Sequence, residues 1–202
     1  MRKRNRTLGG AGLSMGWTRI ARRIRVPMGF VFALFFLLTA HPSLHSLLWS
    51  LLGTAPGIAL RAYASGYVTK NTELTMTGPY AYTRNPLYLG SMLIAFGFAV
   101  AAHSWWIALA LAVLFALIYL PTIRSEEEFL RGQFSDYEAY CARVPRLFPR
   151  LTPASSVTGG GFSGALYRKH REYNAALGAL TIYAVLLLKL SVWHSALFLP
   201  PR

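Results

Sequence analysis

Apolar residues are concentrated in five long segments of this chain, separated by short polar connections. A helix needs about 20 residues to cross the roughly 30 Å hydrocarbon core of a bilayer. The segments approach or reach that length, and they lie at residues 26–40, 44–63, 86–102, 105–123 and 175–199. Pro56 lies within the second segment, where we expect it to kink the helix. The pattern therefore predicts an all-α, multi-pass transmembrane helical bundle of about five spans.

The hydrophobic pattern changes after the fourth segment. Residues 124–140 read RSEEEFLRGQFSDYEAY, with apolar side chains at the three-to-four spacing of one helical face. We expect an amphipathic helix here that ends before Pro145 and Pro149, because proline disfavours a helix interior. The chain then divides into a basic cytoplasmic segment at 1–25, a transmembrane hairpin at 26–67, a core of two transmembrane helices and a cytoplasmic cap at 68–150, a Gly- and Ser-rich linker with a basic stretch at 151–173, and a last transmembrane helix at 174–202.

Composition and charge support a membrane location. Of 202 residues, 54% are hydrophobic and 14% are charged, a balance that is unusual for a soluble domain. Lys and Arg are absent from the first and third connections, at 41–43 and 102–104, but frequent in the N-terminal segment and the other connections. By the positive-inside rule, the N-terminus and the cap are cytoplasmic. We expect a multi-pass protein of a bacterial inner membrane.

The formal net charge of +14 suits contact with anionic lipid headgroups. Nucleic-acid binding is the weaker interpretation, because no aromatic-interleaved basic face accompanies the charge. Cys141 is the only cysteine, which excludes an intrachain disulfide. We therefore expect membrane lipids as partners, no nucleic acid and no metal site, while the oligomeric state stays open.

One motif stands directly before the third apolar segment. Residues 78–90 read GPYAYTRNPLYLG, in which Gly78 and Pro79 favour a turn. Pro86 suits the first turn of a helix, which places Arg84 and Asn85 at the positive end of that helix. This arrangement suits an anion such as a carboxylate. The alternative interpretation is an interfacial anchor of Arg and Tyr at headgroup depth.

This motif resembles the GPY-x-x-x-RHP-x-Y-x-G signature of a family of membrane methyltransferases that includes isoprenylcysteine carboxyl methyltransferase and phospholipid N-methyltransferases. RSEEEFLRGQFSDYEAYCARVPRLFP, at 124–149, resembles the second signature of that family, EE-x-x-L-x-x-x-FG-x-x-Y-x-x-Y followed by VP-x-x-x-P. The resemblance covers about residues 60–150. Asn85 replaces the usual histidine and Ser135 replaces a glycine, so the motif lacks an imidazole at position 85.

The resemblance implies S-adenosylmethionine as cofactor and a lipophilic or lipidated methyl acceptor. It implies Arg84 and Glu127 as catalytic residues. The cofactor-binding residues that it implies are Tyr80, Arg84, Asn85, Tyr88, Gly90, Glu126, Glu127, Tyr137 and Tyr140. Without the resemblance, the acidic run is best explained as a solvated helix face with i,i+4 ion pairs, such as Glu127 with Arg131.

Three functions are consistent with these sequence features. The first is an isoprenylcysteine carboxyl O-methyltransferase-like enzyme. The second is a membrane reductase of the sterol-reductase kind, which would bind the phosphates of NADPH through Arg143, Arg146 and Arg150. The third is a non-catalytic protein of the same fold, for which Asn85 is the hint. The methyl acceptor can be a carboxylate, an amine or a hydroxyl.

Overall fold

The chain is helical in every regular segment that the structure describes. This computed structural model describes residues 29–69, 72–154 and 161–197, with side chains to residue 192. The helices are Gly29–Thr39, α2 (Leu44–Ser65), η1 (Gly78–Ala81), α3 (Pro86–Ala102), α4 (Trp105–Leu114), η2 (Phe115–Tyr119), α5 (Leu120–Gln133), α6 (Tyr137–Arg143), α7 (Gly164–Lys169) and α8 (Tyr173–Leu197). The predicted all-α class is confirmed.

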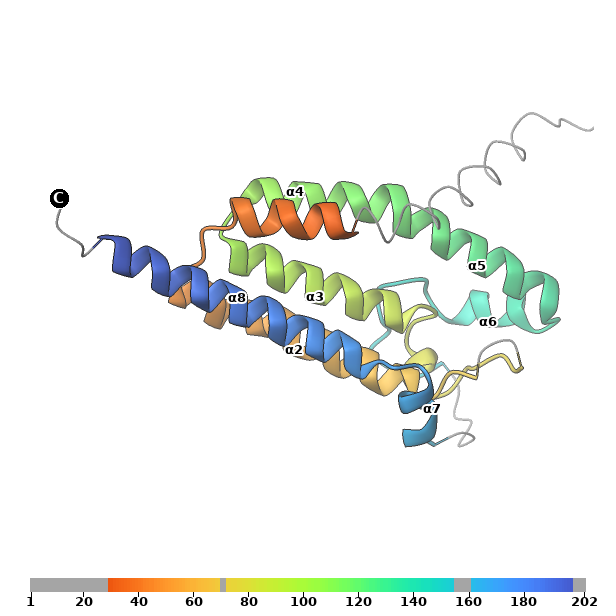
Figure 1. Ribbon diagram of the computed structural model, residues 1–202. Helices are drawn as coiled ribbons and strands as arrows, with labels where there is room; N and C mark the ends of the chain where they lie inside the picture. Colours follow the sequence, from red (N-terminus) through yellow and green to blue (C-terminus); the bar gives the residue numbers. More distant parts are fainter. Residues whose placement is uncertain (1–28, 70–71, 155–160, 198–202) are drawn as a thin grey trace, which may run out of the picture.

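The long helices lie side by side, with the short elements η1, α6 and α7 at one end (Figure 1). Two helices are long and apolar enough to cross a membrane, Trp105–Gln133 and Tyr173–Val192, and Gly29–Thr39 and Pro86–Ala102 are shorter apolar helices. The helix Trp105–Gln133 consists of α4, the π-helical turn η2 and α5, which follow one another without a break. The chain therefore carries candidate membrane helices, while the number of spans stays a prediction.

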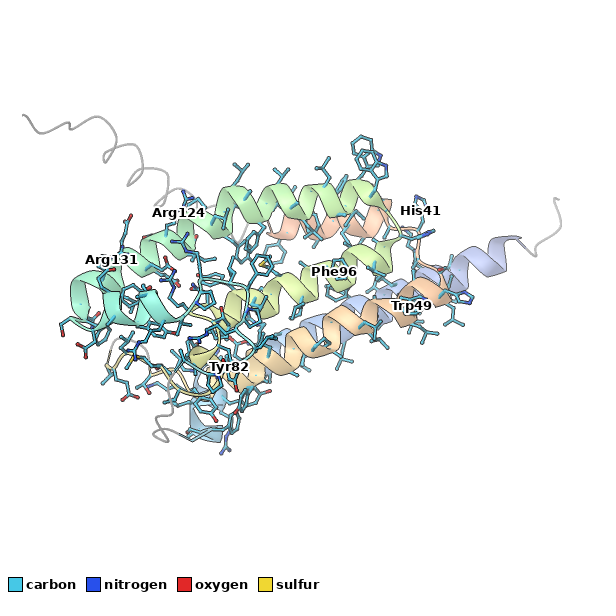
Figure 2. All side chains as sticks on the ribbon, turned by 180° about the vertical axis from the view of Figure 1, so that it is seen from behind. His41, Trp49, Tyr82, Phe96, Arg124 and Arg131 are labelled. Atoms are coloured by element: carbon cyan, nitrogen blue, oxygen red, sulfur yellow. The ribbon has the colours of Figure 1, made fainter. Side chains whose placement is uncertain are left out.

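The surface of the bundle is apolar along its length and polar at one end. Large side chains such as Trp49 and Phe96 are 64% exposed on the flanks of the helices. Figure 2 shows polar side chains gathered at the end that carries Tyr82, Arg124 and Arg131, away from the two flank residues. An exposed apolar belt next to a polar end is typical of a protein whose helices contact lipid.

Helices α2 and α3 pack backbone to backbone through glycines. A Cβ on Gly57 would lie 2.7 Å from the Gly90 carbonyl oxygen, and one on Gly53 would lie 2.9 Å from the Gly97 amide nitrogen. Small residues permit this approach, which is common between membrane helices. Pro56 lies next to this contact, yet α2 runs without interruption from Leu44 to Ser65.

Polar contacts inside the bundle attach α8 to its neighbours. The Tyr183 hydroxyl lies 2.6 Å from Ser50 Oγ and 2.9 Å from Thr54 Oγ1, both on α2. Lys189 Nζ donates to the carbonyl oxygen of Leu37 at 2.7 Å, at the carboxyl end of the Gly29–Thr39 helix. A cation at the end of a helix satisfies carbonyl groups that have no partner within the helix. These contacts place α8 against both α2 and the first described helix.

The amphipathic helix predicted for 124–140 is wrong at its carboxyl end, because α5 stops at Gln133 and α6 starts at Tyr137. Phe134 is extended, with φ −122° and ψ 121°, and its side chain packs beside the buried Tyr137, Tyr140 and Val144. Ser135 and Asp136 favour a helix start over a helix interior, which explains the break. The break turns α6 back toward η1, and this turn builds the site.

Candidate functional site

The two sequence motifs meet through the backbone. The Arg84 amide donates to the Pro145 carbonyl at 2.9 Å, and the Arg150 amide donates to the Tyr82 carbonyl at 3.0 Å. Gly78 has φ +57°, a left-handed conformation that favours glycine, and it starts the short helix η1. Pro86 is the first residue of α3, as its position predicts. The proline-rich tail of the second motif thus holds the loop that carries Arg84.

Glu127 lies at the centre of the site. Its side chain is 4% exposed, and its carboxylate lies 2.7 Å from Arg146 Nη2 and 3.3 Å from Arg84 Nη2. Asn85 Nδ2 donates to the same carboxylate at 3.3 Å and to the Arg146 carbonyl at 3.1 Å. The ion pair between Glu127 and Arg131 that the helical spacing suggests does not form, because Arg131 pairs with Glu138. Glu127 therefore binds both motifs together rather than lying on a solvated helix face.

Glu126 points to a different partner from its neighbour. Its Oε1 accepts a hydrogen bond from the Tyr88 hydroxyl at 2.9 Å, which joins α5 to the first turn of α3. The Tyr88 ring meets the Tyr119 ring edge to face, with centroids 5.9 Å apart. This pair forms a polar edge beside aromatic faces, on the side of the site nearest to the long helices.

Three buried tyrosines lie in η1 and α6, which form the cap of the site. Tyr80, Tyr137 and Tyr140 are each less than one-tenth exposed, and the Tyr140 hydroxyl donates to the Tyr80 carbonyl at 2.8 Å. Burial raises the pKa of each phenol above its ordinary value, most strongly through the loss of hydration of the phenolate. All three phenols are neutral at physiological pH. They supply aromatic faces and hydroxyl groups rather than charge.

The raised tyrosine pKa values predict that the cap loses stability in alkali. A phenol in the unfolded chain ionises near a pKa of about 10, whereas the pKa of folded Tyr140 is higher, so the unfolded state releases its proton first. The contribution is therefore complete below pH ~10 and falls as the pH rises above it. Thermal unfolding in detergent should show a smaller alkaline loss for Tyr140→Phe than for the wild type. An equal loss in both proteins would refute this assignment.

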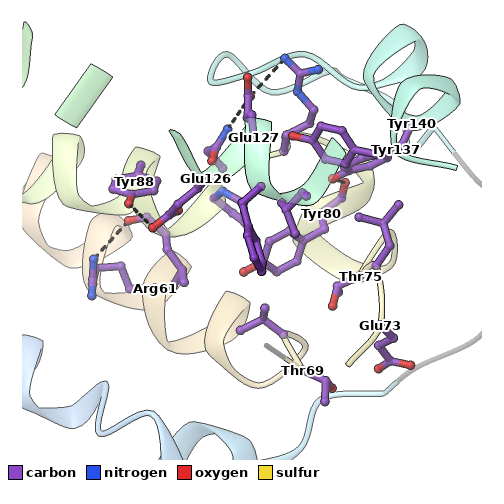
Figure 3. A pocket seen from close by; sticks show the side chains of 18 of the residues that line it. Arg61, Thr69, Glu73, Thr75, Tyr80, Tyr88, Glu126, Glu127, Tyr137 and Tyr140 are labelled. Atoms are coloured by element: carbon purple, nitrogen blue, oxygen red, sulfur yellow. Dashed lines mark hydrogen bonds and ion pairs between the residues drawn. The ribbon is translucent and has the colours of Figure 1, made fainter. Parts of the chain in front are cut away.

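A cavity of about 550 Å³ lies between these groups (Figure 3). Two buried polar atoms in its wall, Arg84 Nε and Thr75 Oγ1, have no hydrogen-bond partner. Unpaired buried polar atoms are costly, so they point to a polar ligand. The lining contains four carboxylates, of Glu73, Glu126, Glu127 and Glu172, and two guanidinium groups, of Arg61 and Arg84. Arg146 pairs with Glu127 from outside the lining, so carboxylates still outnumber guanidinium groups by four to three, which favours a cationic ligand.

The structure brings together all but one of the residues that the sequence selects for the site. The cavity is lined by Tyr80, Arg84, Asn85, Tyr88, Glu126, Glu127, Tyr137 and Tyr140. Gly90 does not line it. Its backbone lies against Gly57 and Arg61 of α2, which leaves no room for a flat ligand on that face. The position of Gly90 is thus explained by helix packing.

Sequence reasoning missed Arg61 and Glu172, and it placed Arg146 only in the alternative reductase site. Arg61 was one of many basic residues near a membrane boundary, and Glu172 is the only acidic residue in the basic run YRKHREY. That isolated carboxylate was the signal that could have drawn attention to it. In the parts of the chain that the structure describes, no group of three or more His, Cys, Asp or Glu residues is placed to hold a metal ion.

Fold and site together define a helical protein with candidate membrane spans and a cavity lined by charged and aromatic residues at one end of the bundle. Residues 44–137 match the protein family described as phospholipid methyltransferase, and they form a domain of that family. The match runs from the start of α2 to the first residue of α6, so it contains most of the cavity wall. Arg146 and Glu172 lie beyond it.

Two relatives are similar over half of the chain. The nickel-cobalt-cadmium resistance protein NccN of Alcaligenes xylosoxydans xylosoxydans is 36% identical over 104 residues, which are 50% of this chain and 49% of the relative. The cobalt-zinc-cadmium resistance protein CzcN of Cupriavidus metallidurans is 35% identical over 104 residues, which are 50% of this chain and 48% of the relative. The chain thus spans about half the length of these relatives. No solved structure matches it significantly.

Proposed function

We propose that this protein is an integral membrane S-adenosylmethionine-dependent methyltransferase, similar to isoprenylcysteine carboxyl O-methyltransferase, with a lipophilic or amphiphilic acceptor. The main support for this proposal is the cavity where both family motifs meet, with Arg84 and Glu127 in its wall. In this proposal the chain crosses the membrane about five times. The cavity faces the cytoplasm, because the basic cap forms the same end of the bundle.

The residues of the cavity fit S-adenosylmethionine. Its volume of about 550 Å³ lies within the range of small-molecule sites. Arg84 presents a buried Nε without a partner, which suits the carboxylate of the cofactor. The excess of carboxylates suits its amine and sulfonium, and buried tyrosines offer aromatic faces to a cation. In this assignment Glu127 holds Arg84 and Asn85 in position, and Glu126 with Tyr88 contacts the cofactor.

S-adenosylmethionine supplies an electrophilic methyl group, so the protein must chiefly orient the acceptor and exclude water. A carboxylate acceptor needs no general base. An amine acceptor must first lose a proton, and the carboxylates that line the cavity, such as that of Glu126, are candidate proton acceptors. The absence of an imidazole at position 85 is therefore compatible with O-methylation of a carboxylate.

The charge of the cavity gives less support to a reductase. NADPH carries several phosphate groups, whereas carboxylates outnumber guanidinium groups in the lining. Arg143, Arg146 and Arg150, the residues expected to bind those phosphates, are not among the lining residues. Arg146 is instead engaged with Glu127. These contacts favour the methyltransferase over the reductase.

Asn85 provides a test of whether the position that lacks the usual histidine belongs to the cofactor site. Its amide donates to Glu127 and to the Arg146 carbonyl, so Asn85→Asp replaces a donor by a second negative charge beside Glu127. We expect S-adenosylmethionine affinity to fall by about tenfold or more, because an unpaired buried group costs ~1–3 kcal/mol. Isothermal titration calorimetry measures this loss. Equal affinity of the wild type and the variant for S-adenosylmethionine would show that Asn85 does not contribute to cofactor binding.

The activity itself is tested with methyl-labelled S-adenosylmethionine. Purified protein in nanodiscs is incubated with a prenylated cysteine, a phospholipid amine, a lipophilic acid and a lipophilic alcohol. The proposal predicts label in one of these lipophilic products, and loss of that label in Arg84→Ala. If NADPH oxidation were observed with a lipophilic alkene instead, the reductase would replace the methyltransferase.

A further inference from the structure

The segment that precedes α8 lies against the end of α2. The Phe162 ring stacks on the Tyr63 ring at a centroid distance of 6.2 Å and an interplanar angle of 9°. The Ser163 amide donates to the Gly66 carbonyl at 2.9 Å, and His170 Nδ1 lies 3.0 Å from the Ser65 carbonyl oxygen. Residues 161–173, which we call the C-terminal strap, therefore contact the same helix end at several points.

One residue near the end of the strap has an uncommon backbone conformation. Arg171 has φ +54°, a left-handed value that is uncommon for a residue with a side chain. Such strain persists where the surrounding contacts fix the conformation, and it is frequent at functional sites. The next residue is Glu172, which lies directly before α8 and lines the cavity.

Glu172 makes a bidentate ion pair with Arg61 of α2. Arg61 Nη2 donates to Glu172 Oε1 at 2.9 Å and to Oε2 at 2.7 Å, and Arg61 Nε donates to Oε2 at 3.0 Å. The other terminal nitrogen of Arg61 donates to Ser91 Oγ at 2.5 Å and to the Leu87 carbonyl at 3.2 Å, both on α3. The two side chains are only 23% and 13% exposed. One guanidinium thus connects α2, α3 and the strap beside the cavity.

We infer that Glu172 completes the site from outside the family domain. Its carboxylate holds the strap against Arg61 as a wall of the cavity, and its charge positions a cationic ligand. The inference rests on the proposed function for the nature of the ligand, but not for the wall. Loss of this carboxylate would leave a half-buried Arg61 without its partner and remove one of the four negative charges of the lining.

The wall is tested without any ligand. Cys141→Ala removes the only thiol, and Leu87→Cys places one in the cavity lining without changing the carbonyl that Arg61 contacts. We expect a water-soluble maleimide to label this protein about tenfold faster when Glu172→Gln is added, since a charge-assisted bidentate contact is lost. Lys169→Gln, an exposed change on the same strap, is the matched control. Equal labelling rates with and without Glu172→Gln would refute the role of Glu172 in holding the strap as a wall of the cavity.

The positioning role is tested by comparing two ligands by calorimetry. S-adenosylmethionine carries a sulfonium charge that S-adenosylhomocysteine lacks. Glu172→Gln should weaken the first by about tenfold and the second much less, while Glu172→Asp should restore the difference. An equal loss for both ligands would show that Glu172 acts only through the fold. If the wild type binds neither ligand, the proposed function and the positioning role are both refuted. The labelling rates would still show whether Glu172 holds the strap as a wall of the cavity.

Discussion

Glu127→Ala is expected to lower the free energy of unfolding by about 3 kcal/mol or more and to abolish S-adenosylmethionine binding. A buried carboxylate with two cationic partners and an amide donor cannot be removed without leaving those groups unpaired. Arg84, whose side chain is 12% exposed, is more affected than Arg146, whose side chain is 41% exposed, because it has less access to water. Thermal unfolding in nanodiscs and calorimetry measure the two losses.

Two further variants separate charge from folding. Glu128→Ala changes the neighbouring residue on α5, which is exposed, and it should leave both stability and binding close to wild type. Glu127→Gln keeps the shape of the side chain and should reduce binding with a smaller loss of stability. If Glu127→Ala unfolded at the same temperature as Glu128→Ala, the central position of Glu127 would be refuted.

Gly57→Ala is the second change with a large expected effect. The new Cβ would lie 2.7 Å from the Gly90 carbonyl oxygen and 2.9 Å from the Ile94 amide nitrogen, and neither backbone atom can move without displacing α3. Such overpacking costs ~1–3 kcal/mol. Arg61 lies one turn further along α2, so a displaced α3 also weakens its contacts with Leu87 and Ser91. We expect lower thermal stability and faster maleimide labelling at Leu87→Cys.

Gly178→Ala is the matched control for this change. Gly178 lies inside α8, and a Cβ there would meet nothing within 4 Å. Replacing glycine by alanine in a helix interior stabilises the helix by ~0.5–1 kcal/mol when the site is open. The two variants should therefore shift the unfolding temperature in opposite directions. A Gly57→Ala protein as stable as wild type would contradict the close contact between α2 and α3.

Much of the fold follows from local sequence. Pro86 fixes the start of α3, and the turn at Gly78 follows from its glycine and the next proline. The helix break at Phe134 does not follow in the same way, because its apolar spacing also suits an uninterrupted helix. The cluster of Phe134 with Tyr137, Tyr140 and Val144 decides the break, and these contacts exist only after α6 folds back.

The candidate site was predictable as a set of residues but not as a network. Spacing and resemblance brought Arg84, Asn85 and Glu127 to attention, yet they did not indicate that a single carboxylate would hold Arg84 and Arg146 together. The pair of Arg61 with Glu172 joins residues 111 positions apart, and no local pattern encodes such a contact. The resemblance implies that Gly90 binds the cofactor, and only the position of α2 shows that Gly90 serves helix packing instead.

Whether the cavity binds S-adenosylmethionine is decided by calorimetric titration of the wild-type protein in nanodiscs, beside Arg84→Ala and with NADPH as the competing ligand. We expect micromolar binding of S-adenosylmethionine at one site, loss of that binding in Arg84→Ala, and no binding of NADPH. A well-folded wild-type protein that binds NADPH, or that binds neither ligand, would contradict this expectation.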